Sequence, residues 1–389
     1  MWITKKMTNK ILVVDDEPDL ETLMLQKFRR RIRAGELEFH FAHNGLEALE
    51  KLRSVEGIEM VLTDINMPQM DGLTLLSELH AFGSLLKAVV VSAYGDLANI
   101  RTAMNRGAFD FLTKPIDFGD LETTISKTLE QVEILKQGRY ARVALNAIEH
   151  ELELAGALQQ SILPINFPHH ADHSLYARMV PAKEIGGDFY DFFYLDSRHL
   201  GLVMADVSGK GVTAAIFMAV SRTLLRFTAL QGIEVGHCLA LVNNLLCADN
   251  DAAMFVTVFY GILDLDSRTL IYANGGHLSP YRIGMDGTVA PLALTGGMAL
   301  GAIEGSAYRS DQLTLDAGDT LLLYTDGVTE ATDANWQLFG EPRLVERLRS
   351  REHLTPGALV DHLVEQIRDF TGTAPLADDV TVLALRLAG

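Results

Sequence analysis

The sequence predicts two domains of different fold class, joined by a long helix. In the first part, short apolar runs alternate with helical stretches, which is typical of a doubly wound α/β domain built on a parallel sheet. In the second part, strand patterns follow one another at hairpin distances, which predicts an α+β layered domain with antiparallel pairing. Between the two parts, residues 118 to 163 contain no proline and no strand signal, so a helix is expected there.

Length, composition and charge set the broad class. The chain has 389 residues, 48% of them hydrophobic, which is enough for packed cores in two or three domains. Its net charge of −18 argues against binding to nucleic acid or to an anionic membrane, because like charges repel. Two cysteines cannot form a disulfide framework, so a cytoplasmic protein is predicted. Neither a signal peptide in the first six residues nor a membrane-spanning run is expected.

The first domain is predicted from four apolar runs that end in polar residues. Each reads as a buried parallel strand, and the stretches between them have the period of a helix. The strands are 10–14, 60–63, 88–91 and 109–115, and two of the helices are 20–33 and 45–53.

Chemically useful side chains stand at the ends of these strands. Asp15 and Asp16 end the first strand and Asp64 the second, so their carboxylates are expected to converge at one edge of the sheet. Three such acids repel one another unless a cation neutralises them, and hard oxygen ligands suit Mg²⁺. Ser92 adds a hydroxyl and Lys114 a positive charge, which together predict a site that accepts a phosphoryl group on a carboxylate.

Residues 8–128 thus resemble the receiver domain of two-component response regulators. The resemblance implies that Asp64 is the phosphoacceptor, that Asp15 and Asp16 hold Mg²⁺, and that Ser92 and Lys114 contact the phosphoryl oxygens. It also implies a cis bond at Lys114-Pro115 and a switch aromatic at Phe111. The alternative is that these acids only cap helices.

The connector, residues 129–165, carries an apolar seam. Seven-residue spacing relates Leu121, Thr128 and Leu135, and again Leu145, Leu152 and Gln159, with a slip of phase near residues 137–139. Pro164 is expected to end the helix. Two interpretations stay open: a helix packed on its own domains, or a parallel coiled coil that makes a homodimer.

The second domain is predicted from six strand patterns and four helical ones. The strands are 174–181, 200–205, 255–263, 269–273, 320–325 and 381–387, and the helices are 214–228, 236–249, 343–350 and 356–371.

Aspartates recur in this domain beside glycine or at strand ends. They fall in Gly186–Asp191, Ala205–Gly211, Thr325–Gly327 and Ala377–Val380, and no histidine or cysteine cluster suggests zinc. Several aspartates around one point fit two Mn²⁺ or Mg²⁺ ions, which ready a hydroxide for attack on phosphorus.

With Asn274-Gly275-Gly276-His277, these motifs resemble the PP2C-type serine/threonine phosphatases, specifically the bacterial sporulation and stress branch, over residues 174–389. The resemblance implies a PP2C-like β-sandwich. It also implies metal ligands, with catalytic roles, at Asp188, Asp206 and Asp326, at one or both of Asp378 and Asp379, and at the backbone carbonyl of Val207; Lys183 would contact phosphate.

Other residues of these motifs have plainer interpretations. His277 fits a tight turn better than a catalytic role, Ser208 is expected to stabilise a turn, and Lys210 is expected to be a solvated loop charge, with docking of an acidic partner as its alternative.

Together the two resemblances predict a response regulator whose phosphorylation on Asp64 by a sensor histidine kinase controls a metal-dependent protein phosphatase. The implied substrate is a phosphorylated anti-anti-sigma (STAS) protein in partner switching, and no serine-kinase module is expected after the last motif. The alternative is a receiver-gated adaptor that binds a sigma factor or another regulator without turnover. A DNA-binding regulator ranks third, since no basic helix-turn-helix pattern follows the receiver.

Overall fold

The computed structural model describes residues 8–93, 96–167, 170, 172–248, 250–349, 351 and 353–388. Residues 1–7, where no signal peptide is expected, lie outside this set, as do Asp249 and Ser350, the last residues of two predicted helices. The chain divides into two compact units, Met1–Ala147 and Ile148–Gly389, which are described separately. The predicted domain limits at 128, 165 and 174 stay predictions.

The first unit is built on a five-stranded parallel sheet, as predicted. The strand order β2-β1-β3-β4-β5 places β1 and β3 side by side at the centre. The strands are β1 (Asn9–Val14), β2 (Leu37–Ala42), β3 (Ile58–Asp64), β4 (Lys87–Ala93) and β5 (Asp110–Lys114). Strand β2 was not predicted, because its glutamate and histidine interrupt the apolar pattern of this edge strand.

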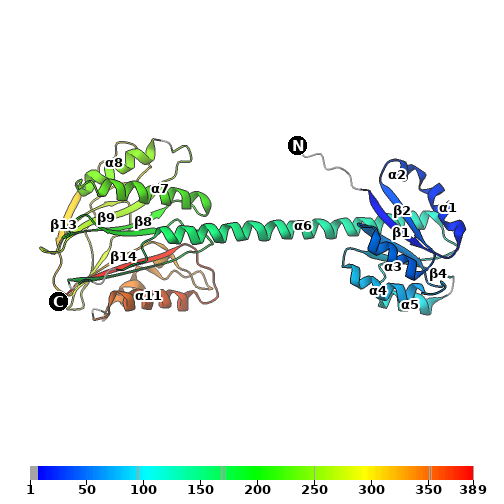
Figure 1. The fold of residues 1–389 in the computed structure, drawn as a ribbon. Helices are drawn as coiled ribbons and strands as arrows, with labels where there is room; N and C mark the ends of the chain where they lie inside the picture. Colours follow the sequence, from blue (N-terminus) through cyan, green and yellow to red (C-terminus); the bar gives the residue numbers. More distant parts are fainter. Residues whose placement is uncertain are drawn as a thin grey trace. The chain divides into compact units, whose positions relative to one another are not determined.

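Helices cover both faces of this sheet (Figure 1). Asparagine or aspartate begins α3, α4 and α5 by accepting a backbone N–H of the first turn, from Asn44, Asp71 and Asp96 respectively. The single predicted helix 20–33 is two helices, because the backbone turns at Phe28 (φ −92°, ψ 10°). The helices are α1 (Pro18–Lys27), α2 (Arg29–Arg33), α3 (Gly45–Ser54), α4 (Gly72–Leu79) and α5 (Leu97–Asn105), with a short 3-10 helix, η1, at His80–Phe82.

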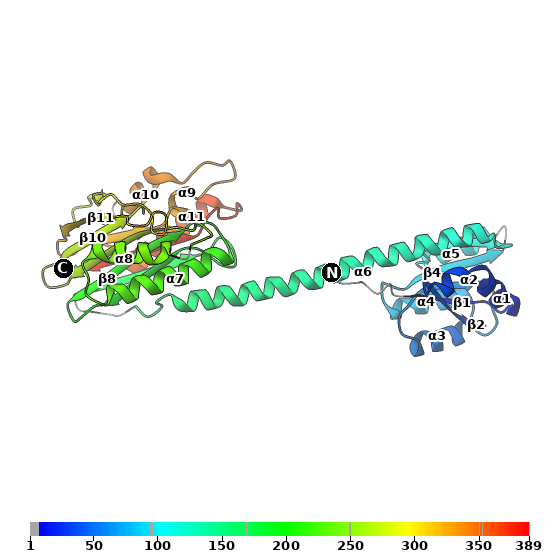
Figure 2. The same ribbon diagram turned by 90° about the horizontal axis from the view of Figure 1, so that it is seen from above.

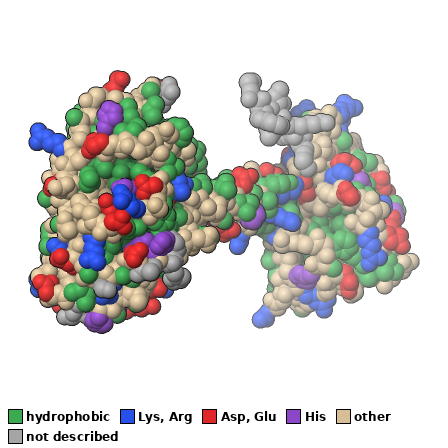
Figure 3. Space-filling model, turned by 60° about the vertical axis from the view of Figure 1, so that its left-hand side comes forward, with side chains coloured by type: hydrophobic (Ala, Val, Ile, Leu, Met, Phe, Trp, Pro, Cys, Tyr) green, Lys and Arg blue, Asp and Glu red, His purple; other side chains and the backbone are tan. Residues whose placement is uncertain are grey.

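The predicted connector is one continuous helix, α6 (Phe118–Ile162). Its first turns pack on the sheet of the first unit through Leu121, Ile125 and Leu129. Further along, apolar side chains are exposed to solvent, and Figure 3 shows hydrophobic side chains on its surface. They are Ile134, Leu135, Tyr140, Val143, Leu145, Ile148, Leu154 and Leu158.

The second unit is a sandwich of two five-stranded sheets. One has the order β13-β10-β9-β8-β7 and the other β12-β11-β14-β15-β6, with antiparallel pairing throughout. The strands are β6 (His173–Val180), β7 (Phe189–Tyr194), β8 (His199–Val207), β9 (Val256–Asp264), β10 (Thr269–Gly275), β11 (Tyr281–Ile283), β12 (Val289–Pro291), β13 (Ser310–Thr314), β14 (Thr320–Tyr324) and β15 (Val380–Leu387).

Helices cover the outer face of each sheet, which gives four layers and confirms the predicted fold class (Figures 1 and 2). On the first sheet lie α7 (Val212–Ala229) and α8 (Val235–Cys247); on the second lie α9 (Gly327–Glu330), α10 (Gly340–Leu348) and α11 (Pro356–Thr371). Strands β7, β11, β12 and β13 were not predicted from the sequence. Two of these have three residues, and β7 is too continuously buried to alternate.

Among the described residues, α7 is the one helix long and apolar enough to cross a membrane by length and composition, with a mean hydropathy of 1.3 over 18 residues. No membrane-spanning run was expected from the sequence, and α7 meets these criteria with two arginines within its length. The helix nevertheless packs on β8 and α8, and its Arg222 and Arg226 form ion pairs with the buried Asp191 of β7. Core helices of globular domains share this composition.

Candidate functional site

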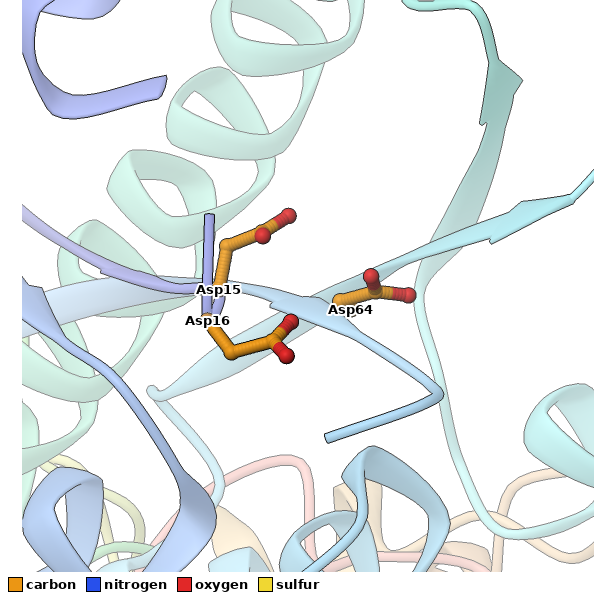
Figure 4. Close-up of side chains that lie close together, drawn as sticks. All are labelled: Asp15, Asp16 and Asp64. Carbon is orange, nitrogen blue, oxygen red and sulfur yellow. The ribbon is translucent and has the colours of Figure 1, made fainter. Parts of the chain in front are cut away.

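The structure brings together the three predicted acids of the first unit. Oxygens of Asp15, Asp16 and Asp64 lie within 4.8 Å of one another, at the carboxyl ends of β1 and β3 (Figure 4). Asp15 and Asp64 are buried and Asp16 is exposed, so the cluster opens to solvent on one side. Burial raises the pKa of Asp15, although Lys114 and a backbone N–H oppose the shift.

Lys114 and Ser92 border this cluster from β5 and β4. The Lys114 ammonium lies 2.6 Å from Asp64, 3.2 Å from Asp15 and 3.0 Å from Glu17. Burial lowers the pKa of Lys114, but hydrogen bonds to Asp64 and Glu17 outweigh it and raise the pKa above its usual value. The buried Ser92 hydroxyl has no hydrogen-bond partner among the described residues.

This arrangement fits a hard divalent cation and a phosphoryl group. Three oxygen donors converge, and the orphaned Ser92 hydroxyl offers the hydrogen bond that an added oxygen would accept. The Lys114-Pro115 bond is cis, as the resemblance implies. Phe111 lies on β5 and is 40% exposed; its role as the switch aromatic stays a prediction.

In the second unit, Asp188 is the most deeply buried of the predicted acids. It stands directly before β7 and is buried, and the hydroxyls of Thr325 and Thr381 each donate to its Oδ2 at 2.6 Å. Burial raises the pKa of Asp188 well above its usual value, and the charges of Asp206 and Asp379 raise it further. Neither threonine was expected to have a role, although Thr325 belongs to one of the acidic motifs and Thr381 directly follows another.

Asp206 and Asp326 reach the same region from β8 and from the turn after β14. Burial and the charges of Asp326 and Asp378 raise the pKa of Asp206 to about 7. Burial and the charges of Glu330 and Asp378 raise the pKa of Asp326 to about 6. Partly buried carboxylates that repel one another are stabilised when a cation binds between them. Raised pKa values of this kind are therefore typical of the acids of an unfilled metal site.

Asp378 and Asp379 are adjacent in sequence but differ in environment. Asp379 is buried, and its carboxylate accepts hydrogen bonds from the backbone N–H groups of Ala182 (2.8 Å), Gly187 (2.6 Å) and Asp188 (3.4 Å). Asp378 is half-buried and forms an ion pair with Lys210. Asp379 therefore organises the loop before β7, while Asp378 offers oxygens to a cation.

Lys210 is an exposed charge in the loop between β8 and α7, as expected, and it also contacts the acids. Its ammonium lies 2.8 Å from Asp378 and also bonds to the carbonyl oxygen of Ala377, because the surrounding acids attract it. The exposed Lys183 lines the same small cavity as Lys210, Asp378 and Asp379. Both lysines are thus beside the acids.

The second-unit acids offer the oxygen ligands that Mn²⁺ and Mg²⁺ prefer, but within the described part of the chain only Asp15, Asp16 and Asp64 have oxygens that all lie within 4.8 Å of one another. Asp188, Asp206, Asp326 and Asp378 supply hard oxygens, and the described residues here include no histidine or thiol partner that would favour zinc. The carbonyl oxygen of Val207 faces Gly187, where a Cβ would lie 3.0 Å from it. The absence of a side chain at Gly187 keeps that carbonyl accessible.

The remaining motif residues have structural contacts. His277 is buried; its Nδ1 pairs with the Thr257 hydroxyl at 2.8 Å and its Nε2 with the Tyr324 carbonyl at 3.1 Å. Desolvation lowers its pKa to about 4, so the ring is neutral, as expected for a satisfied turn histidine. The Ser208 hydroxyl accepts the N–H of Phe255 at 3.0 Å, so it links the residue after β8 to the residue before β9; its role in a turn stays a prediction.

Fold and geometry together define a receiver domain joined to a PP2C-type phosphatase domain, and comparison with known proteins agrees. Residues 11–126 match the response regulator receiver domain, and residues 196–388 match the stage II sporulation protein E (SpoIIE) family. The phosphoserine phosphatase RsbU of Bacillus subtilis is 31% identical over 246 residues, which cover 61% of this chain and 70% of RsbU.

Two further relatives were found. Protein IcfG of Synechocystis sp. is 31% identical over 262 residues, which cover 60% of this chain but only 41% of IcfG. The SiaA-PP2C domain of Pseudomonas aeruginosa aligns with a TM-score of 0.55 at 24% identity, covering 62% of this chain and 98% of that one, and so supports the fold. The chain belongs to the SpoIIE/RsbU family of PP2C-type protein phosphatases, with a response regulator receiver domain at its N-terminal side.

Proposed function

We propose that this chain is a response regulator in which phosphorylation of Asp64 controls hydrolysis of phosphoserine or phosphothreonine in a protein substrate. The carrying observation is that acids of the second unit come together from β8 and from the segments before β7, after β14 and before β15. Burial and mutual repulsion raise the pKa values of three of them, Asp188, Asp206 and Asp326. The similarity to RsbU, a phosphoserine phosphatase, supports the substrate class.

Asp188, Asp206, Asp326 and Asp378, with the carbonyl of Val207, would hold two Mn²⁺ or Mg²⁺ ions. Such ions neutralise the phosphoester and activate water for in-line attack on phosphorus. Thr325 and Thr381 fix the Asp188 carboxylate, and Asp379 fixes the backbone that carries it. Lys183 and Lys210 are the cations available to an incoming phosphate.

In the first unit, Asp15 and Asp16 would hold Mg²⁺ beside Asp64, and a sensor histidine kinase would donate the phosphoryl group. Lys114 is already within reach of Asp64, and the unpaired Ser92 hydroxyl is available to a phosphoryl oxygen. Asp64 belongs to the first unit and the hydrolytic acids to the second, so its phosphorylation would act as a regulatory signal.

We further propose a phosphorylated anti-anti-sigma (STAS) protein as the substrate, in a cytoplasmic partner-switching pathway. The five acidic and glycine motifs of the sporulation and stress branch support this assignment, and the two free cysteines suit a reducing compartment. The exposed apolar side chains of α6 support a homodimer through this helix.

The deciding experiment is Mn²⁺-dependent hydrolysis of p-nitrophenyl phosphate and of candidate phosphorylated STAS proteins, with and without beryllofluoride. We expect hydrolysis by the wild type and none by Asp326→Asn, because the variant loses one charge of the site. Wild-type protein that binds a partner but turns over neither substrate would favour the receiver-gated adaptor instead.

A further inference from the structure

His277 lies between the two sheets of the second unit, and its ring nitrogens contact one strand of each sheet. Nδ1 lies 2.8 Å from the hydroxyl of Thr257 on β9, and Nε2 lies 3.1 Å from the backbone carbonyl of Tyr324 on β14. Strands β9 and β14 belong to different sheets. One buried side chain, only 6% exposed, therefore joins the two sheets of the sandwich.

The two partners of the ring determine where its proton lies. A carbonyl oxygen can only accept a hydrogen bond, so the neutral ring carries its proton on Nε2 and donates it to Tyr324. Nδ1 then accepts a hydrogen bond from the Thr257 hydroxyl. Both ring nitrogens are thus used, which an apolar side chain of the same size could not do.

The loop that carries His277 holds the ring in this place. The Asn274 side chain accepts the His277 N–H at 2.7 Å and donates to the His277 carbonyl at 2.8 Å. Gly276 has a φ of 75°, which favours glycine, and a Cβ there would lie 3.0 Å from the backbone nitrogen of Ala299. The Asn-Gly-Gly-His motif therefore fixes the position of the histidine ring.

Both ends of this bridge lie next to acids of the proposed metal site. Thr257 is paired with Asp206 between β9 and β8, and its hydroxyl lies 3.4 Å from the Asp206 backbone carbonyl. On the other sheet, one residue separates Tyr324 from Asp326. The bridge therefore influences the spacing between Asp206 and Asp326, whose negative charges lie close enough to repel.

The hydrogen bonds of Asp188 also span the two sheets, but they use a proposed metal ligand itself. Thr325 and Thr381 each donate to the Asp188 carboxylate, whose surroundings change when an ion binds. The bonds of His277 involve no carboxylate, so they can persist unchanged with and without an ion.

We propose that His277 is a positioning residue: by joining β9 to β14, it holds Asp206 and Asp326 at the spacing that binds Mn²⁺. Without this bridge the sheets are less well fixed behind the acids, and bringing the acids together costs free energy that lowers the affinity for the ion. The inference rests on the proposed function of these acids as metal ligands. It extends the set of residues that determine metal affinity beyond the acidic motifs.

The first test measures Mn²⁺ binding by the full chain without substrate, from the electron paramagnetic resonance signal of free Mn²⁺. His277→Phe keeps a ring and removes both bonds, so we expect the Mn²⁺ dissociation constant of the second unit to rise about 10–100-fold. His277→Gln retains a donor and should show a smaller rise, and it carries the test if the phenylalanine variant does not fold.

The matched control is His237→Gln, because His237 is exposed in the same unit and should tolerate the change without effect on Mn²⁺ binding. The acids of the first unit are the same in all these variants. A difference in Mn²⁺ binding between the variants therefore belongs to the second unit.

A double-mutant cycle separates positioning from general damage. Thr257→Val removes the hydroxyl that donates to Nδ1. It should raise the Mn²⁺ dissociation constant of the wild type but add little in His277→Phe, because the two residues act through one bond. In p-nitrophenyl phosphate hydrolysis, His277→Gln should need more Mn²⁺ for half-activation while keeping most of its kcat at saturating Mn²⁺.

The inference is overturned if the His277 variants that fold bind Mn²⁺ as His237→Gln does, if the effects of Thr257→Val and His277→Phe are simply additive, or if kcat falls with unchanged metal affinity. Should the wild type hydrolyse no substrate at any Mn²⁺ concentration, the proposed function itself is wrong. Wild-type turnover, together with His277 variants that behave as the control does, would reject the positioning role alone.

Discussion

The N–H of Gly187 donates to Oδ2 of Asp379 across 2.6 Å, so a carboxylate of the segment before β15 holds the loop before β7. Its neighbour Asp378 makes no such bond to that loop and instead faces Lys210. Two adjacent aspartates thus divide between them the support of the loop and the supply of oxygens to a cation.

This division predicts different effects for the same substitution at the two positions. Asp378→Asn should leave the loop intact, with an unfolding free energy near that of the wild type, but should lower Mn²⁺-dependent hydrolysis at least about 100-fold, because a metal ligand is lost. Asp379→Asn places an amide where backbone N–H groups converge, and should cost about 1–3 kcal/mol of stability. Urea unfolding and p-nitrophenyl phosphate assays on both variants distinguish the roles. Full activity in Asp378→Asn would reject its assignment as a ligand.

Asp64→Asn should prevent labelling of the chain by acetyl phosphate or by a cognate kinase, because the acceptor oxygen is replaced by an amide. Basal hydrolysis by the second unit should be unchanged, since Asp64 belongs to the other unit. Phosphate incorporation measured by mass spectrometry checks the prediction. Ser92→Ala is the companion variant, which should slow labelling without abolishing it. Complete labelling of the asparagine variant would place the acceptor elsewhere.

The buried His277 predicts a loss of stability in mild acid. Its pKa is lowered to about 4 in the folded chain, from 6.5 as the ordinary value, so the unfolded chain binds more protons between these pH values. His277 therefore contributes its full share to the free energy of unfolding above pH 6.5. This share, about 3 kcal/mol, is lost as the pH falls from 6.5 toward 4. Unfolding of wild type and His277→Gln, compared at pH 7.5 and pH 5, should show the smaller pH dependence in the variant. Equal pH dependence would mean that His277 titrates normally.

The apolar surface of α6 predicts self-association. Leu145 is 54% exposed, so Leu145→Asp should not disturb the folding of a single chain, yet it places a charge in the predicted seam. We expect a shift from dimer to monomer in analytical ultracentrifugation. Asn146→Asp adds the same charge at the next position, outside the seam, and should remain dimeric. A wild type that is monomeric at all concentrations would favour the interpretation as a helix packed on its own domains.

The sequence predicts the first unit well because its chemistry follows strand ends. Asp15, Asp64, Ser92 and Lys114 each close an apolar run, and a parallel sheet must bring such residues to one edge. Strand β2 cannot be predicted in this way, because this edge strand contains Glu38 and His40 and has no continuous buried run like those of the other strands.

The second unit is harder to predict at the level of contacts. Its acidic motifs predict which residues lie close together in the fold. Only the structure shows that Asp379 accepts hydrogen bonds from backbone N–H groups, while Asp378 forms an ion pair with a lysine. The same holds for Gln159, which in sequence is one of two adjacent glutamines. Only its burial and its two bonds to Gly186 distinguish it from Gln160.

The ion pair between Lys210 and Asp378 has a consequence for how the protein responds to metal supply. A divalent ion that binds Asp378 would displace the Lys210 ammonium. The free energy gained on binding is therefore the difference between the attraction of Asp378 for the ion and its attraction for Lys210. The charge of Asp378 would thus be balanced both before and after the exchange.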